Sequence, residues 1–122
     1  MSQWPRTLQV TYPFDAMLSK NKMWRRSRFG SIYLANRQSM NRLALFLSNA
    51  KSTQKFKIIP NIKLHVAIMV FKPSNRCDAS NFVDTINDAV SKSLYIDDRW
   101  FSGSYDWGID KIEPRFEITI TQ

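Results

Sequence analysis

The chain has very little of the chemistry that cysteine and histidine provide. It contains one cysteine, Cys77, and one histidine, His65. A single cysteine excludes an internal disulfide and suits a reducing compartment, and the two residues together cannot build a Cys-rich or multi-His zinc site. His65 falls in the middle of an apolar run, far from any turn, which favours a packed or edge residue over a catalytic base. Nothing near Cys77 marks it as a nucleophile.

Long hydrophobic runs are also missing. No stretch approaches the ~18 consecutive apolar residues of a membrane-spanning helix. Residues 1–5 show no basic-then-apolar pattern of a secretory signal. We therefore expect a cytoplasmic protein with no membrane partner.

What the chain has in excess is positive charge. Its 18 Lys and Arg against 10 Asp and Glu give a net charge of +8 and a pI near 9.9. Its 122 residues, 43% of them hydrophobic, suffice for one core and predict a single domain over residues 1–122. A strongly basic balance favours a polyanionic partner, most commonly nucleic acid, although a basic domain without such a partner is the alternative.

Hydrophobic periodicity predicts six elements in the order β-α-β-α-β-β. The expected strands cover residues 7–12, 62–71, 100–112 and 115–121, and the expected helices begin near residue 36 and near residue 80. Both faces of the 62–71 run are mostly apolar, which predicts a central strand covered on both sides. The pattern indicates an α+β domain with a mixed β-sheet and two main helices.

Acidic residues stand at two predicted turns of this basic chain. Asp78 lies at a strand-to-helix junction, and Asp97 and Asp98 lie at the following helix-to-strand junction. Magnesium prefers oxygen ligands, and carboxylates drawn from distant segments can hold it beside a phosphate. Each acid also has a simpler explanation, since Asp78 suits a helix N-cap and an Asp-Asp pair suits a turn. Whether the two junctions meet depends on the tertiary fold.

The spacing of these residues resembles that of the RusA family of Holliday-junction resolvases, small endonucleases common in phages and prophages. The segments that carry the resemblance are Asp78-Ala79-Ser80-Asn81, Asp88-Ala89-Val90 and Leu94-Tyr95-Ile96-Asp97-Asp98. The resemblance implies a RusA-like fold and a homodimer that nicks four-way DNA junctions with Mg²⁺ or Mn²⁺, in the host cytoplasm if the chain is phage encoded. It implies that Asp78 and Asp98 are the essential carboxylates and that Asn81 is an orienting residue.

Two positions depart from the family pattern. Ser80 stands where the family has its second acid, and Asp84 stands where it often has a lysine. Ser80 and Asp84 are four residues apart, so we expect them on one helix face, where Asp84 can supply the missing metal ligand. Asp88 and Asp97 are possible accessory acids, and Ser80 and Asn81 are possible accessory residues, because Ser80 can still hold a metal-bound water or a phosphate. The lost lysine would need a replacement from Lys72, Arg76 or Lys92. The alternative is a catalytically weakened or inactive protein of the same fold that binds branched DNA.

Basic residues interleaved with aromatic ones suggest where DNA binds. The densest group comprises Lys20, Lys22, Arg25, Arg26 and Arg28, together with Trp24 and Phe29. Arginine binds phosphate through paired hydrogen bonds, and aromatic rings stack on unpaired bases. Lys72, Arg76 and Lys92 are further candidates near the acids. A solvated loop, or an RNA-binding protein without a metal, would explain the same pattern.

Overall fold

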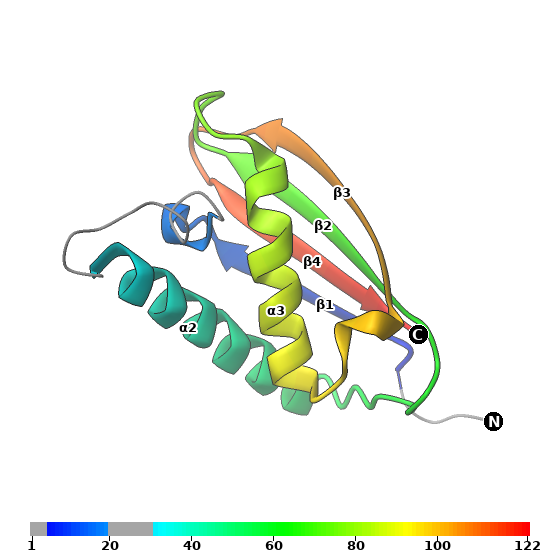
Figure 1. Cartoon of the computed structure of the whole chain (residues 1–122). Helices are drawn as coiled ribbons and strands as arrows, with labels where there is room; N and C mark the ends of the chain where they lie inside the picture. Colours follow the sequence, from blue (N-terminus) through cyan, green and yellow to red (C-terminus); the bar gives the residue numbers. More distant parts are fainter. Residues whose placement is uncertain (1–4, 20–30) are drawn as a thin grey trace.

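The computed structural model describes residues 5–19 and 31–122, and only the backbone of residues 31–35. It is a single small α+β domain with one mixed four-stranded sheet, in the strand order β1-β4-β2-β3. Both long helices pack on the same face of this sheet (Figure 1). The expected order β-α-β-α-β-β is confirmed.

The elements lie close to their predicted positions. They are β1 (Thr7–Pro13), η1 (Ala16–Leu18), α2 (Ser31–Thr53), β2 (Leu64–Lys72), η2 (Ala79–Phe82), α3 (Val83–Leu94), η3 (Asp98–Trp100), β3 (Phe101–Ile109) and β4 (Arg115–Thr121). The helix expected from residue 36 starts earlier, at Ser31, because residues 31–35 contain no glycine or proline to prevent it. Within the described residues, no helix is both long enough and apolar enough to cross a bilayer.

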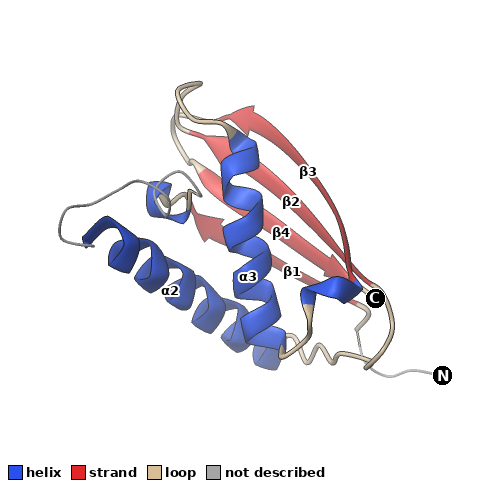
Figure 2. Ribbon diagram, viewed as in Figure 1, coloured by secondary structure: helices blue, strands red, loops and turns tan. Residues whose placement is uncertain are grey.

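The helices cover one face of the sheet only, so the expected double covering of β2 is wrong. Leu64, Val66, Ile68 and Val70 are buried under the helices, whereas His65 on the opposite face is exposed. The other residues of that face, Ala67, Met69 and Phe71, are partly exposed. Figure 2 shows both helices on the same side of the strands. Apolar residues on the open face produced the misleading pattern, because small or isolated apolar side chains are tolerated at a protein surface.

Three aromatic rings attach the start of α3 to the sheet. Phe82 packs against Phe14 and Phe116, and all three ring pairs have centroids 5.3 Å apart. Phe82 and Phe116 are fully buried. Because Phe82 closes η2, this cluster fixes the short turn that follows Asp78.

The connection from β2 through α3 to β3 places the acidic junctions. β2 and β3 are parallel, with Leu64 opposite Phe101 and Lys72 opposite Ile109. Asp78 therefore follows the end of β2, whereas Asp98 precedes the start of β3. Parallel strands joined by a helix put these two junctions at opposite ends of the sheet.

Candidate functional site

Asp78 is a cap as well as a candidate ligand. Its Oδ1 accepts a hydrogen bond from the backbone N–H of Ser80 at 3.0 Å, at the start of η2. Hydrogen bonds from the Ser80 backbone and side chain, and the nearby charge of Lys72, lower the pKa of Asp78 below its usual value. The capping role that the sequence allowed is thus present, and it keeps the exposed carboxylate ionised.

Lys72 lies beneath the segment that carries Asp78. It is 3% exposed, and its Nζ donates to the Cys77 carbonyl at 2.8 Å and to the Asn75 Oδ1 at 3.2 Å. The same ammonium lies 3.9 Å from the ring centroid of Trp107 on β3. Lys72 therefore holds the 73–78 loop in place. The sequence suggested that Lys72 contacts DNA. In the structure its ammonium donates instead to groups of the protein itself.

Asp78 and Asp98 do not converge within one chain. Asp78 precedes the start of α3, whereas Asp98 follows its end and turns back beside Asp88. Ligands of one ion lie within a few ångströms of each other. Because β2 and β3 run parallel, the two junctions lie at opposite ends of the sheet, and a single copy does not bring these two carboxylates together. The expectation that both junctions form one cation site is wrong for the isolated chain, because β3 runs parallel to β2.

A different set of acids does come together beside α3. Asp88, in the middle of the helix, has Asp84 one turn before it and Asp98 as a neighbour from η3. Partial burial raises the pKa of Asp88 above its usual value, and repulsion from Asp98 and then Asp84 raises it further. We call Asp84, Asp88 and Asp98 the α3 acids. Their mutual repulsion is what a bound cation would relieve.

The turn after α3 returns Asp98 to the helix. Tyr95 ends the helix in the left-handed conformation, at φ 55°, and the N–H of Ile96 then bonds to the Ser91 carbonyl at 3.2 Å. Buried Ile96 anchors the returning chain. Asp97 caps η3 by accepting from the N–H of Arg99 at 2.9 Å, as its turn-like sequence indicated.

Ser80 and Asp84 are not stacked on a single α-helix. Ser80 belongs to the 3₁₀ turn η2, and α3 starts only at Val83. The four-residue spacing of an α-helix face therefore does not apply between them. Asn81, which donates its backbone N–H to the Asp78 carbonyl at 3.1 Å, supports the turn structurally.

The α3 acids do not form a closed metal site as they stand. Among residues 5–19 and 31–122, no group of three or more Asp, Glu, His or Cys side chains is close enough to hold an ion. Their carboxylate oxygens are the right donors for Mg²⁺. Coordination would require side-chain rotation or a ligand from elsewhere.

The residues predicted to bind DNA differ in where they lie and in what they contact. Lys20, Lys22, Arg25, Arg26 and Arg28 lie outside the described residues. Lys92 donates to the Asn41 Oδ1 on α2 at 2.6 Å, at the opposite end of α3 from Asp78. Arg76 is exposed beside Asp78, and its guanidinium has no partner among the described residues.

The sequence did not connect Trp107 with Asp78. The two residues line the same hollow at the end of β2, and Trp107 is 46% exposed. The clustering of late aromatic residues suggested only core or dimer contacts. The signal that was available is the two-residue alternation of β3, which puts Trp107 on the same face as Lys72.

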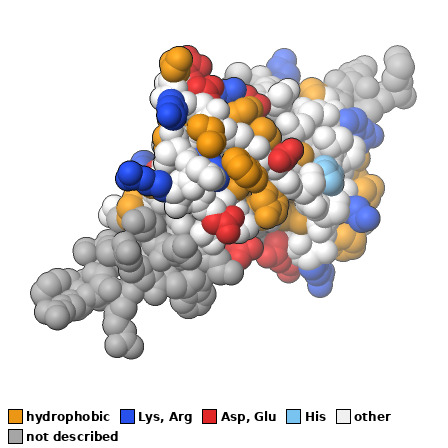
Figure 3. All heavy atoms as spheres, turned by 90° about the horizontal axis from the view of Figure 1, so that it is seen from above, with side chains coloured by type: hydrophobic (Ala, Val, Ile, Leu, Met, Phe, Trp, Pro, Cys, Tyr) orange, Lys and Arg blue, Asp and Glu red, His pale blue; other side chains and the backbone are white. Residues whose placement is uncertain are grey.

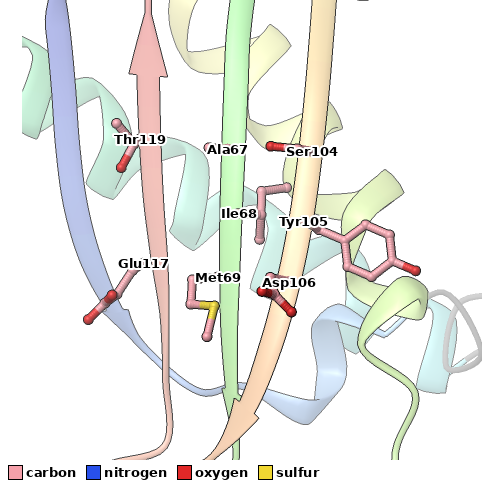
Figure 4. Close-up of a pocket in the computed structure, with 8 residues that line it drawn as sticks. All are labelled: Ala67, Ile68, Met69, Ser104, Tyr105, Asp106, Glu117 and Thr119. Atoms are coloured by element: carbon pink, nitrogen blue, oxygen red, sulfur yellow. The ribbon is translucent and has the colours of Figure 1, made fainter.

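A larger hollow on the open face of the sheet is a poorer candidate for nucleic acid. It encloses about 410 Å³, and its lining includes the acids Asp106 and Glu117 but no lysine or arginine. Figure 4 shows these two acids on either side of Met69. Seen from above, the surface carries a band of hydrophobic side chains with acidic side chains beside it (Figure 3). Phosphate would be repelled from such a lining.

Comparison with known proteins gives no family. No family model matches the chain, and no curated protein matches it.

Proposed function

We propose that this protein is a magnesium-dependent endonuclease that resolves four-way DNA junctions by paired nicks, as its resemblance to the RusA family implies. The observation that carries the proposal is that Asp98 and Asp84 lie beside partly buried Asp88, whose pKa burial and then these neighbours raise, in a chain with net charge +8. Acids crowded together on a basic protein favour a cation at that place and a polyanion around it.

The α3 acids are the residues that would hold Mg²⁺. The ion, when bound, supplies a Lewis acid and an activated water for phosphodiester hydrolysis. The chain itself keeps Asp98 beside α3 through the turn at Tyr95, and it keeps Asp78 ionised through the Ser80 hydrogen bonds. Arg76 provides an unpaired positive charge next to Asp78 for a backbone phosphate.

A homodimer would allow Asp78 to contribute to the metal site. In one copy Asp78 follows the end of β2, whereas Asp98 precedes the start of β3 at the other end of the parallel pair. A two-fold axis that reverses one copy relative to the other can bring Asp78 of one copy beside Asp98 of the second. Such a dimer would present the same site to two equivalent strands of a junction.

A second candidate function is branched-DNA binding without cleavage. It is favoured by the open arrangement of the acids within the described residues and by the capping bond that engages Asp78. Gel-shift and nicking assays on the same samples separate the two, because binding without product in Mg²⁺ supports this alternative.

Matched acid-to-amide variants test the proposal. Asp98→Asn, Asp84→Asn and Asp88→Asn should each reduce metal-dependent nicking of a four-way junction by roughly 10-fold or more. Asp106→Asn on the open sheet face is the control, because it is exposed and lies outside the α3 acids. Equal loss in the control, or no loss in the three variants, would reject the assignment. Wild-type activity in Asp84→Asn with none in Asp78→Asn would reject Asp84 as the replacement ligand.

A further inference from the structure

A shallow hollow opens at the end of β2 and β3, next to Asp78. It encloses about 340 Å³, which is the size of a small-ligand site. Its lining comprises Trp107 from β3, Lys72 at the end of β2 and the 75–79 segment. Its character differs from that of the open-face hollow, because it combines an aromatic ring with two positive charges.

The ring of Trp107 is held in position and can act as a stacking surface for a flat ligand. The Lys72 ammonium lies 3.9 Å from the ring centroid, and Lys72 is itself held by the Cys77 carbonyl and Asn75. Trp107 is 46% exposed as a residue, so the part of its side chain that Lys72 does not cover is open to a ligand. A ring that is already held in place loses little conformational entropy when a flat ligand stacks on it.

Lys72 also determines how Asn75 faces a ligand. An ammonium group can only donate, so the oxygen of the Asn75 amide must point toward the Lys72 Nζ, at 3.2 Å. The amide NH₂ of this exposed residue is then directed elsewhere, with no other partner among the described residues. It can donate to a ring nitrogen or carbonyl oxygen on the edge of a base.

The charge of the hollow suits a phosphate at one end. Lys72 and Arg76 contribute two positive charges against the single negative charge of Asp78. The Arg76 guanidinium is exposed and has no partner among the described residues. A phosphate placed at Arg76 gains a charge-assisted hydrogen bond and lies away from the α3 acids.

We propose that this hollow binds one unpaired nucleotide of a DNA strand, with the base stacked on Trp107, its edge read by Asn75 and its phosphate bound by Arg76. The inference rests on the proposed function, because the nucleotide would adjoin Asp78, which the proposed dimer brings beside Asp98 of the second copy. It adds a specificity element, since a junction must expose an unpaired base at the crossover for this contact to form.

The test is binding of a fluorescently labelled dT12 strand in EDTA, followed by anisotropy, so that no cleavage contributes. Trp107→Leu should weaken binding by roughly 5- to 100-fold, and Trp107→Phe should weaken it less. Arg76→Ala should reduce the slope of log K against log salt by about 0.7. Asn75→Ala should reduce discrimination between dT12 and other homopolymers of the same length. A matched rU12 strand and a linear duplex are the competitors, and dT12 should bind more tightly than the duplex.

Tyr105→Ala is the matched control. Tyr105 is on the same strand and face, two residues before Trp107, and is similarly exposed at 48%, but it lies outside the hollow. It should change binding less than about 2-fold, since no base stacks on it. Wild-type binding by folded Trp107→Leu, or an equal loss in Tyr105→Ala, would overturn the proposal. If Trp107→Leu fails to fold, wild-type binding by both folded Trp107→Phe and Arg76→Ala would overturn it. Stronger binding of rU12 would reassign the ligand to RNA and overturn the DNA assignment.

The two proposals can fail separately. If junction nicking is absent but dT12 binding depends on Trp107, the nuclease proposal is wrong and the nucleotide site stands. If a junction is nicked with Mg²⁺ while Trp107 and Arg76 variants bind dT12 as the wild type does, the nucleotide site is wrong and the nuclease proposal stands.

Discussion

Asp98 approaches Asp88 from a separate turn of the chain, where partial burial and then the negative charge of Asp98 raise the pKa of Asp88. The left-handed residue Tyr95 makes it possible, because it ends α3 and sends the chain back beside the helix. The fold thus tolerates like charges next to each other, at a cost in stability that a cation would remove.

Asp88→Asn should therefore stabilise the protein near neutral pH. The folded pKa of Asp88 is raised above the unfolded value of 3.8, so the folded state holds the proton more tightly. Its contribution to stability is favourable at low pH and decreases as pH rises from the unfolded pKa through the folded one. At pH 7 the variant should melt up to about 4 °C above the wild type, and at pH 3 the two should coincide. A lower melting temperature at pH 7 would contradict the charge cluster.

Divalent cations should also raise the melting temperature of the wild-type protein. Mg²⁺ or Mn²⁺ that binds only the folded state raises its melting temperature as concentration increases. The shift should be smaller in Asp88→Asn and unchanged in Asp106→Asn, since Asp106 lies on the open sheet face. Differential scanning fluorimetry at constant ionic strength measures it. An identical shift in all three proteins would place the cation elsewhere.

Lys72→Met should loosen the loop that carries Asp78. The substitution removes the hydrogen bonds to the Cys77 carbonyl and Asn75 from a residue that is 3% exposed. Hydrogen bonds to a charged group contribute about 1.5–3 kcal/mol each. Removing the ammonium also removes the cost of burying its charge, which offsets part of this loss. Urea unfolding should therefore show a free energy of unfolding lower by roughly 1–3 kcal/mol. Lys92→Met is the control, because its bond to Asn41 is exposed and should matter by less than about 0.5 kcal/mol. Equal losses would show that Lys72 has no special structural role.

The elements that the sequence predicted well are those whose residues have local preferences. The strand at 115–121 matches β4 (Arg115–Thr121), because Phe116, Ile118 and Ile120 alternate with exposed or half-exposed neighbours. The turn at Asp97 was predicted equally well, because its side chain accepts a hydrogen bond from Arg99, only two residues further along the chain. Local hydrogen bonds and alternation need no information about the rest of the fold.

The relationships that could not be predicted depend on direction in space. Nothing within residues 100–112 states that β3 runs parallel to β2, and that direction alone separates Asp78 from Asp98. The opposite direction would have put both acids at the same end. The open face of β2 also looked buried, because Met69 and Phe71 are apolar whether or not a helix covers them.

Mixing two inactive variants tests whether Asp78 and Asp98 work together across a dimer. If each site takes one acid from each copy, a mixed dimer of Asp78→Asn and Asp98→Asn has one site with both acids and one with neither. The mixture should nick one strand of a junction, with up to about half of the dimers active by random pairing of copies. If both acids act within one chain, the mixture should remain inactive.

The Asp78→Asn variant suits this mixing experiment because asparagine caps a helical turn about as well as aspartate. The bond from the Ser80 N–H should persist, so circular dichroism and melting at neutral pH should stay close to the wild type. Asp78→Ala, which loses the capping oxygen, is the structural control. A dimer that does not exchange copies on mixing can be formed by co-expression.

DNA binding should weaken steeply as salt increases if the basic residues between Lys20 and Arg28 contact phosphates. Replacing Arg25, Arg26 and Arg28 by glutamine should lower the slope of log K against log salt by about 2.7 on duplex arms if all three contact phosphate. Anisotropy with a four-way junction in EDTA between low and physiological salt measures the slope. An unchanged slope would place the phosphate contacts on other residues.

The most direct test of the central claim is cleavage of a four-way junction by the wild-type protein, with each strand labelled in turn and run on a denaturing gel. Symmetric nicks in two opposing strands should appear with Mg²⁺ or Mn²⁺, disappear in EDTA and be absent on a linear duplex of the same sequence. Bound junction without nicks in either metal, at a protein concentration that shifts all of the DNA, would contradict the assignment as a resolvase.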